Sequence, residues 1–87
     1  MSFTSRRPRE FRFSSHALQR ISERGIRRRW VRAAVGTQPT RHGRHTIFVL
    51  TAKQLGHRFG DSFTDGVRVV VDQGRALIVT AHWLSRG

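Results

Sequence analysis

Histidine and arginine side chains are the residues of this chain whose types and spacing could do chemistry. His16, Arg20 and Arg24 follow one another at i, i+4 and i+8, so on a helix they would share one face. His82 lies near the C-terminus with Thr80 two residues before it, so on a strand these two would share a face. If that strand lies under the helix, the five side chains could converge, and we take them as the candidate catalytic residues.

Such a set suits cleavage of RNA by its own 2′-hydroxyl group. That reaction needs a base for the 2′ proton, an acid for the leaving 5′ oxygen, and cations that stabilise the phosphorane. We assign the base or acid role to His16 and the second proton transfer to His82. Arg20 and Arg24 would hold the scissile phosphate. The reaction requires no metal and no cofactor, and we expect none.

Each of these residues also has a structural alternative. His16 could hydrogen-bond a backbone carbonyl near the start of its helix. Arg20 and Arg24 could be solvated, or could pair with Glu23 or with the edge of the sheet. His82 could simply lie on an exposed face of its strand. The spacing alone does not decide between these roles.

Other catalytic classes lack their residues. The chain has no cysteine, which excludes disulfides, thiol nucleophiles and cysteine-based zinc sites. Gly56 and Gly60 are not followed by the Lys-Ser/Thr pair of a phosphate-binding loop. His42 and His45 could be two metal ligands, but no obvious further ligands accompany them, and the five acidic residues are scattered. We therefore expect no metal site.

The charge is large and unevenly distributed. The 87 residues, enough for one domain, carry a formal charge of +12, and Lys53 is the only lysine among 17 cationic residues. Residues 1–50 carry a net charge of +10 and residues 51–87 a net charge of +2. The planar arginine fork suits phosphate and stacks on bases. We therefore expect RNA as the partner, free or associated with the ribosome, with an acidic protein as the alternative.

The expected RNA contacts lie mainly in the first half of the chain. Residues 1–10 form a basic arm, and Arg27, Arg28 and Arg29 stand at the start of a predicted helix. Positive charge there opposes the helix dipole, at about 0.3–1 kcal/mol per exposed charge, and a phosphate would relieve this cost. The same run could equally be a solvated face. Arg12 and Lys53 complete the predicted contacts.

Two helices are predicted in the first half of the chain. The first spans residues 16–24, with Ser14 or Ser15 as its N-cap and Gly25 at its C-terminal cap. Ala17, Leu18 and Ile21 form its apolar side. The second spans residues 28–35, where Trp30 belongs to the core stripe, and Trp83 is also expected in the core rather than as a base-stacking platform.

Before the helices, Phe11 and Phe13 flank Arg12, an alternation that predicts a short strand or an extended lead-in. Further strands are predicted to follow the helices. After a turn over residues 40–43, an alternating pattern predicts a strand over 44–51, and residues 52–66 look irregular with one possible helical turn over 51–57. Strands over 67–72 and 75–83 would form a hairpin at Gln73-Gly74. Residues 11–87 are thus one α+β domain, with two N-terminal helices on a three- to four-stranded antiparallel sheet.

One sequence pattern resembles a known family. Ser14-Ser15-His16-Ala17, followed by Arg20 and by Arg24-Gly25-Ile26, is similar to the opening of the bacterial domain of unknown function 4258. The resemblance spans about residues 13–83 and continues in the strands that contain Val67–Val71 and Ile78–Thr80. The arginines at 27–29 depart from it, because the family usually has a Ser- or Asp-like cap there, and the stretch 53–65 is longer than expected.

The resemblance implies a fold like that of the small RelE- and BrnT-type toxins, some of which cleave RNA and are held in check by an antitoxin. His16, Arg20, Arg24 and Thr80 match recurring polar positions of the family. We therefore predict a toxin-like, metal-independent endoribonuclease of the toxin–antitoxin type. The alternatives are a non-catalytic RNA- or ribosome-binding module and a protein that acts through an acidic partner. No apolar run reaches about 18 residues and no secretory signal is evident, so we expect a cytoplasmic protein without membrane contact.

Overall fold

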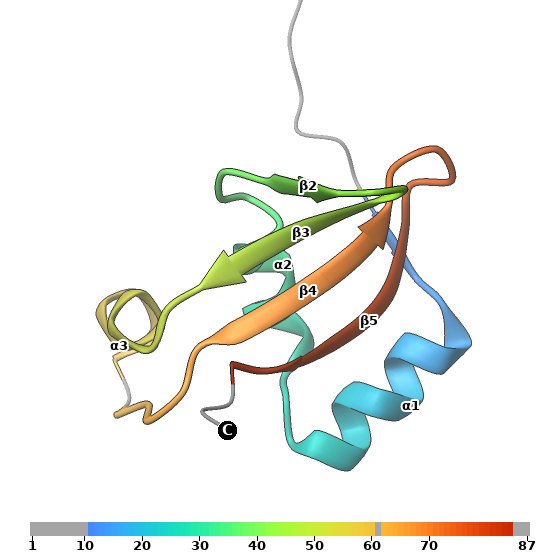
Figure 1. The fold of residues 1–87 in the computed structure, drawn as a ribbon. Helices are drawn as coiled ribbons and strands as arrows, with labels where there is room; N and C mark the ends of the chain where they lie inside the picture. The colour runs from blue at the N-terminus through green and yellow to red at the C-terminus, as the bar shows by residue number, and fades with distance from the viewer. Residues whose placement is uncertain (1–10, 61, 85–87) are drawn as a thin grey trace, which may run out of the picture.

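A five-stranded sheet in the order β1-β5-β4-β3-β2 forms the centre of the computed structural model, which describes residues 11–60 and 62–84 (Figure 1). Its strands are β1 (Arg12–Phe13), β2 (Thr40–His42), β3 (His45–Leu50), β4 (Val67–Asp72) and β5 (Leu77–Trp83). The helices of the described part are α1 (Ser15–Arg24), α2 (Arg28–Ala34) and α3 (Ala52–Phe59). The α+β class is thereby confirmed.

The sheet differs from the predicted one in size and direction. It has five strands in place of three or four, and it is mixed, because β1 pairs parallel to β5 with Arg12 opposite Leu77. The predicted turn at residues 40–43 is wrong in part: Thr40–His42 is strand β2, which pairs antiparallel with β3. All three residues of β2 are exposed, so this strand carries no alternation that a sequence could reveal.

Helices α1 and α2 cover one face of the sheet, α1 against β5 and α2 against β3 and β4 (Figure 1). The residues of β4 alternate between buried and half-buried, and the inward-facing Val67, Val69 and Val71 are fully buried. From the helices, Ala17 and Ile21 of α1 and Val31 of α2 complete this core. Burial of these apolar side chains holds the two layers together.

The ends of α1 follow the prediction. Ser14 is the N-cap, and its Oγ accepts a hydrogen bond from the Ala17 N–H at 2.9 Å. Gly25 has the left-handed conformation (φ 70°), and the Ile26 N–H then donates to the Ile21 carbonyl at 2.9 Å. The second helix also lies where it was predicted, although Arg27 at its N-cap position makes no side-chain capping bond.

Residues 52–59 correct a second prediction, because this stretch forms the eight-residue helix α3 rather than one turn. A capping box begins it: the Gln54 N–H donates to Thr51 Oγ1 at 3.2 Å, and the Thr51 N–H donates to Gln54 Oε1 at 2.8 Å. Leu55 is fully buried and anchors α3 to the core. Gly60 ends the helix at φ 79°.

The hairpin between β4 and β5 is longer than predicted and contains a register shift. Residues 73–76 make the turn, because Asp72 Oδ1 accepts from the Arg75 N–H at 3.3 Å, and Ala76 takes a positive φ of 52°. In β5, Ile78 lies opposite Val71 but Thr80 lies opposite Val70. Val79 is therefore an extra residue, and beyond it the faces of β5 are exchanged.

Candidate functional site

The first two turns of α1 carry an exposed polar group. Arg20 Nε donates to His16 Nε2 at 3.5 Å, which agrees with the predicted shared face. Arg20 Nη1 also forms an ion pair with Glu23 Oε1 at 3.0 Å. The two side chains of this pair are 40% and 49% exposed, so the pair adds little stability, about 0.2–1 kcal/mol. Arg20 thus pairs with Glu23, as the alternative to a catalytic role predicted. Because the pair is exposed and weak, a phosphate could replace Glu23 as the partner of Arg20.

Arg24 lies at the other end of α1 and contacts the sheet. Its Nη1 donates to the Ala81 carbonyl of β5 at 2.8 Å, and its own carbonyl accepts from the Trp83 indole N–H at 2.8 Å. The two-residue strand β1 pairs only with the start of β5, so the rest of that edge is left to α1. Arg24 therefore supports the junction of α1 and β5 in addition to any role toward a ligand.

His82 occupies the face of the sheet opposite to α1 and α2. The exchanged register turns Thr80 and His82 to this open face, while Ala81 stays fully buried in the core. Arg68 lies directly opposite His82 on β4. Burial of the imidazole lowers the pKa of His82 below its usual 6.5, and the charges of Arg68 and Arg24 lower it further. The neutral form of the His82 imidazole is therefore favoured near the charges of Arg68 and Arg24.

The five predicted catalytic residues thus form two groups. His16 and Arg20 belong to the exposed turns of α1, whereas Arg24, His82 and Thr80 lie along the second half of β5. His16 is about 12 Å from Arg24 along the axis of α1, from eight residues at 1.5 Å each. Within residues 11–60 and 62–84, no hydrogen bond or ion pair joins the two groups.

Arg68 is the member of this site that the sequence analysis missed. It follows Val67 in a strand that was predicted over residues 67–72, but which face of that strand Arg68 would occupy was not predicted. Its partner across the strands depends on the four-residue turn and on the extra residue Val79. No signal in the sequence gives that register.

The arginines at the start of α2 lie on aromatic rings. Arg27 stands over the ring of Trp30 at 5.8 Å and Arg29 over the ring of Phe59 at 5.6 Å. Arg28 and Arg32, one turn apart, both stand over Phe13, at 5.9 and 5.0 Å. These cation–π contacts, each about 0.5–1 kcal/mol at exposed sites, offset the unfavourable charge at the helix start. A guanidinium group that lies over a ring still has N–H groups that can donate to a phosphate.

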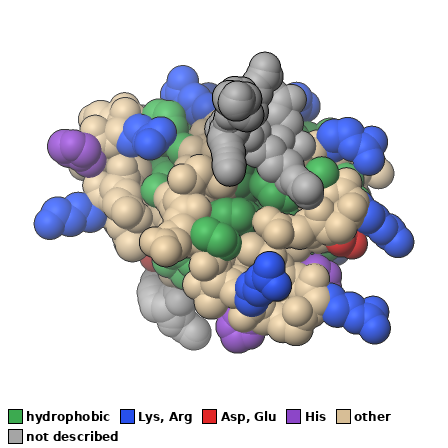
Figure 2. Space-filling view, turned by 90° about the horizontal axis from the view of Figure 1, so that it is seen from above, with side chains coloured by type: hydrophobic (Ala, Val, Ile, Leu, Met, Phe, Trp, Pro, Cys, Tyr) green, Lys and Arg blue, Asp and Glu red, His purple; other side chains and the backbone are tan. Residues whose placement is uncertain are grey.

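The other predicted RNA contacts are spread over the surface. Arg12 is exposed on β1, Lys53 is exposed on α3, and the predicted basic arm of residues 1–10 lies outside the described residues. Lys53 borders a hollow of about 570 Å³ together with His57 and Arg58, with Leu50 at its apolar floor. Figure 2 shows that Lys and Arg side chains stand around the periphery of one face, with hydrophobic side chains exposed between them.

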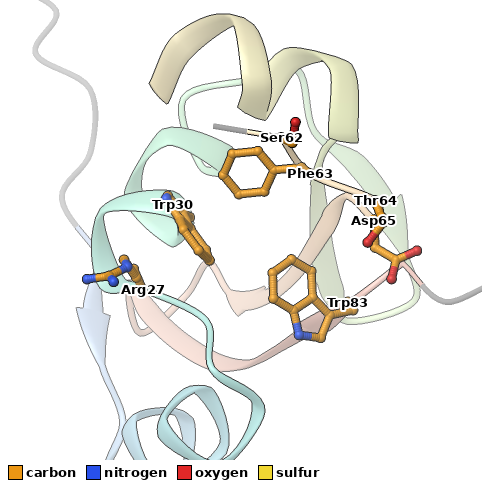
Figure 3. Close-up of a pocket in the computed structure, with 7 residues that line it drawn as sticks. All are labelled: Arg27, Trp30, Ser62, Phe63, Thr64, Asp65 and Trp83. Atoms are coloured by element: carbon orange, nitrogen blue, oxygen red, sulfur yellow. The ribbon is translucent and has the colours of Figure 1, made fainter. Parts of the chain in front are cut away.

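A second hollow, of about 500 Å³, is lined by aromatic rings (Figure 3). Trp30 meets Phe63 edge-to-face at 4.9 Å, and Trp83 stands 5.8 Å from Trp30. The other lining residues are Arg27, Ser62, Thr64 and Asp65. Trp30 is buried as predicted, with 8% exposure, but Trp83 is only half-buried and forms a wall of this pocket. We name these seven residues the aromatic pocket.

The described residues contain neither a metal-binding cluster nor a membrane-spanning helix. In the described ranges no three or more His, Asp or Glu side chains are placed to hold a metal ion; His42 and His45 face each other across β2 and β3. No helix of the described part is long and apolar enough to cross a bilayer. Comparison of the chain with known protein families, with curated proteins and with solved structures gave no match.

Proposed function

We propose that this protein binds single-stranded RNA and cleaves it without a metal ion at the open face of β5. The observation that carries the proposal is the position of His82, a half-buried imidazole with Arg68 opposite it on β4 and the charge of Arg24 beside it. A neutral base beside two guanidinium groups meets the needs of a phosphate ester reaction. The net charge of +12 supports RNA as the substrate.

The reaction assigns one role to each side chain. His82 takes the proton of the 2′-hydroxyl, the 2′ oxygen bonds to phosphorus, and the bond from phosphorus to the 5′ oxygen breaks. Arg24 and Arg68 bind the phosphate and stabilise its growing negative charge. Water protonates the leaving oxygen, because His16 lies toward the other end of α1. The products carry a 2′,3′-cyclic phosphate and a 5′-hydroxyl.

The resemblance to RelE- and BrnT-type toxins supports the same proposal. It adds a cytoplasmic setting, a substrate that is bound at the ribosome, and an acidic antitoxin that covers the basic surface. The exposed arginines of α1 and α2 supply the charge that such a partner would complement. Thr80, on the same face as His82, would line the path of the RNA.

The test is cleavage of a defined RNA in the presence of EDTA by wild type and by His82→Ala. We expect a loss of about 10²–10⁴-fold in rate for His82→Ala, the usual cost of a positioned proton acceptor. His45→Ala is the matched control, since His45 is an exposed histidine of β3. A 2′-deoxy substitution at the cleaved position should abolish the reaction. Equal rates for His82→Ala and wild type would refute the assigned base.

A second function, RNA binding without cleavage, is favoured by one specific observation. Arg20 is paired with Glu23 and Arg24 with the Ala81 carbonyl, so both arginines already have partners within the protein. In that case RNA binds with a steep salt dependence, and no cleavage products form with the wild-type protein.

A further inference from the structure

The aromatic pocket has features that its packing role does not account for. Trp30 Nε1 is buried with no hydrogen-bond partner among the described residues, an arrangement that phenylalanine would avoid. Asp65 is half-buried at the pocket, and its carboxylate makes no hydrogen bond or ion pair within residues 11–60 and 62–84. Among the described residues this carboxylate is therefore unpaired at the rim of the aromatic pocket, which indicates a place for a ligand with N–H donors.

The charges of the pocket have a direction. Figure 3 shows Arg27 at one end, beyond Trp30, and Asp65 at the other, beside Trp83, with Phe63 between them. A nucleotide is complementary to this arrangement, because its anionic phosphate suits the Arg27 end and the N–H donors at the far edge of its base suit the Asp65 end. A nucleotide that lies along the rings would place its phosphate toward Arg27 and the edge of its base toward Asp65.

A cationic ligand fits the pocket less well. Arg27 already stands over the ring of Trp30 at 5.8 Å, so a second cation would meet its charge there. The formal charge of +12 also opposes the approach of a cation. A neutral planar base stacks on aromatic rings without this repulsion.

The geometry points to a guanine-binding pocket, and we propose that the aromatic pocket holds the base of a guanosine nucleotide in RNA. Guanine is selected because its N1–H and its 2-amino group point in parallel and suit the two oxygens of the Asp65 carboxylate. Adenine presents a ring acceptor at the corresponding position, which would face the carboxylate unfavourably. Arg27 then binds the phosphate.

This inference rests on the proposed function in one respect, because it takes RNA as the natural ligand. Trp83 and His82 are neighbours on β5 whose side chains lie on opposite faces of the sheet. The guanine in the pocket would accordingly belong to a nucleotide that flanks the cleaved one. It would determine which sequences are bound and leave the cleavage chemistry to His82.

The two tryptophans of the chain both line the pocket, so their fluorescence reports on it directly. The experiment titrates the whole protein with 5′-GMP, 5′-AMP and 5′-UMP and follows tryptophan emission excited at its red edge. We expect saturable quenching with GMP at concentrations at least about tenfold below those needed for AMP or UMP, the size of one bidentate base contact. No RNA cleavage is required, so this result is separable from that of the cleavage assay.

Two variants and two controls test the residues. Asp65→Asn should remove the preference for GMP over AMP, while the matched carboxylate change Asp72→Asn should keep it. Phe63→Leu retains most of the apolar volume and should weaken GMP binding about tenfold through loss of stacking, whereas Phe59→Leu, outside the pocket, should not. Circular dichroism checks that each variant is folded.

Three results would overturn the inference. They are the absence of saturable quenching by GMP, an unchanged GMP preference in Asp65→Asn, and saturation by tetramethylammonium in place of GMP. The last result would identify the pocket as a cation cage. Failure of RNA cleavage alongside selective GMP quenching would instead refute the proposed function and leave the pocket standing.

Discussion

Replacement of Gly66 by alanine tests how tightly the pocket loop is joined to the sheet. Gly66 directly precedes β4, and its carbonyl accepts from the Leu84 N–H at 2.7 Å. A Cβ atom at Gly66 would lie 2.5 Å from the Leu50 carbonyl oxygen, 2.9 Å from Thr51 Cα and 2.9 Å from Leu84 Cδ1. Two of these three atoms belong to the backbone, so the ends of β3 and β4 must move apart.

The size of the effect follows from these distances. Overpacking of a filled site costs about 1–3 kcal/mol, and a clash with backbone atoms places Gly66→Ala in the upper part of that range. Alanine also lowers the conformational entropy of the unfolded chain relative to glycine, which offsets about 0.4–1 kcal/mol of this loss. The net loss is therefore roughly 2 kcal/mol, which in a domain of this size lowers Tm by about 8–16 °C. Displacement of residues 62–65 should also weaken GMP binding.

Thermal unfolding followed by circular dichroism measures this loss. Gly36→Ala is the matched control, because a Cβ there would meet only the Ala33 carbonyl oxygen, at 3.4 Å, an ordinary contact. Its Tm should stay unchanged or rise slightly, since the same unfolded-state gain applies without a clash. A Tm for Gly66→Ala equal to or above that of the wild type would refute the close approach of Gly66 to Leu50 and Thr51.

Three further predictions concern charge and capping. If four to six phosphates are neutralised, the logarithm of the affinity for single-stranded RNA should fall against the logarithm of the salt concentration with a slope of roughly −3 to −4. Fluorescence anisotropy measures this affinity, and a slope near zero would exclude RNA as the partner. Since the pKa of His82 is lowered in the folded state, the unfolded state binds its proton first. His82 should therefore lower the free energy of unfolding as the pH falls below 6.5. The urea midpoint should fall less with decreasing pH in His82→Gln than in the wild type, whereas His45→Gln should behave like the wild type. Thr51→Ala removes the capping box of α3 and should cost about 0.5–2 kcal/mol in urea unfolding, while Thr40→Ala on exposed β2 should change little.

Some elements could be predicted because their signals lie within a few residues of one another. Ser14 and Gly25 bound α1 through contacts made three to five residues away, and both were identified from the sequence. The same kind of signal was present for α3, where Thr51 and Gln54 have the spacing of a capping box and Gly60 follows the last turn. Only one turn was predicted there, because Gly56, Gly60 and Gly66 gave residues 52–66 an irregular pattern.

The alternation of Phe11, Arg12 and Phe13 indicated a short strand or an extended lead-in at β1, but the parallel pairing of β1 and the whole of strand β2 lie beyond such reasoning. Each strand is short, and each exists because a neighbouring strand offers free backbone groups: β5 to β1 and β3 to β2. The free energy that holds them comes from pairing with residues far along the chain for β1 and from a tight turn for β2. Neither contribution is visible in the composition of the strand itself.

In the candidate site, too, some contacts follow from local spacing in the sequence and others only from the tertiary structure. The contact of Arg20 with His16 was determined by the sequence alone, because a helix places residues i and i+4 side by side. The meeting of His82 with Arg68, and of Phe63 with Trp30, was decided only by the tertiary structure. Strict alternation would put Ile78, Thr80 and His82 on one face, yet Ile78 is fully buried while His82 faces outward. The extra residue Val79 makes this possible, and only the packing of Ile78 and Ala81 into a core assembled from the whole chain selects that register.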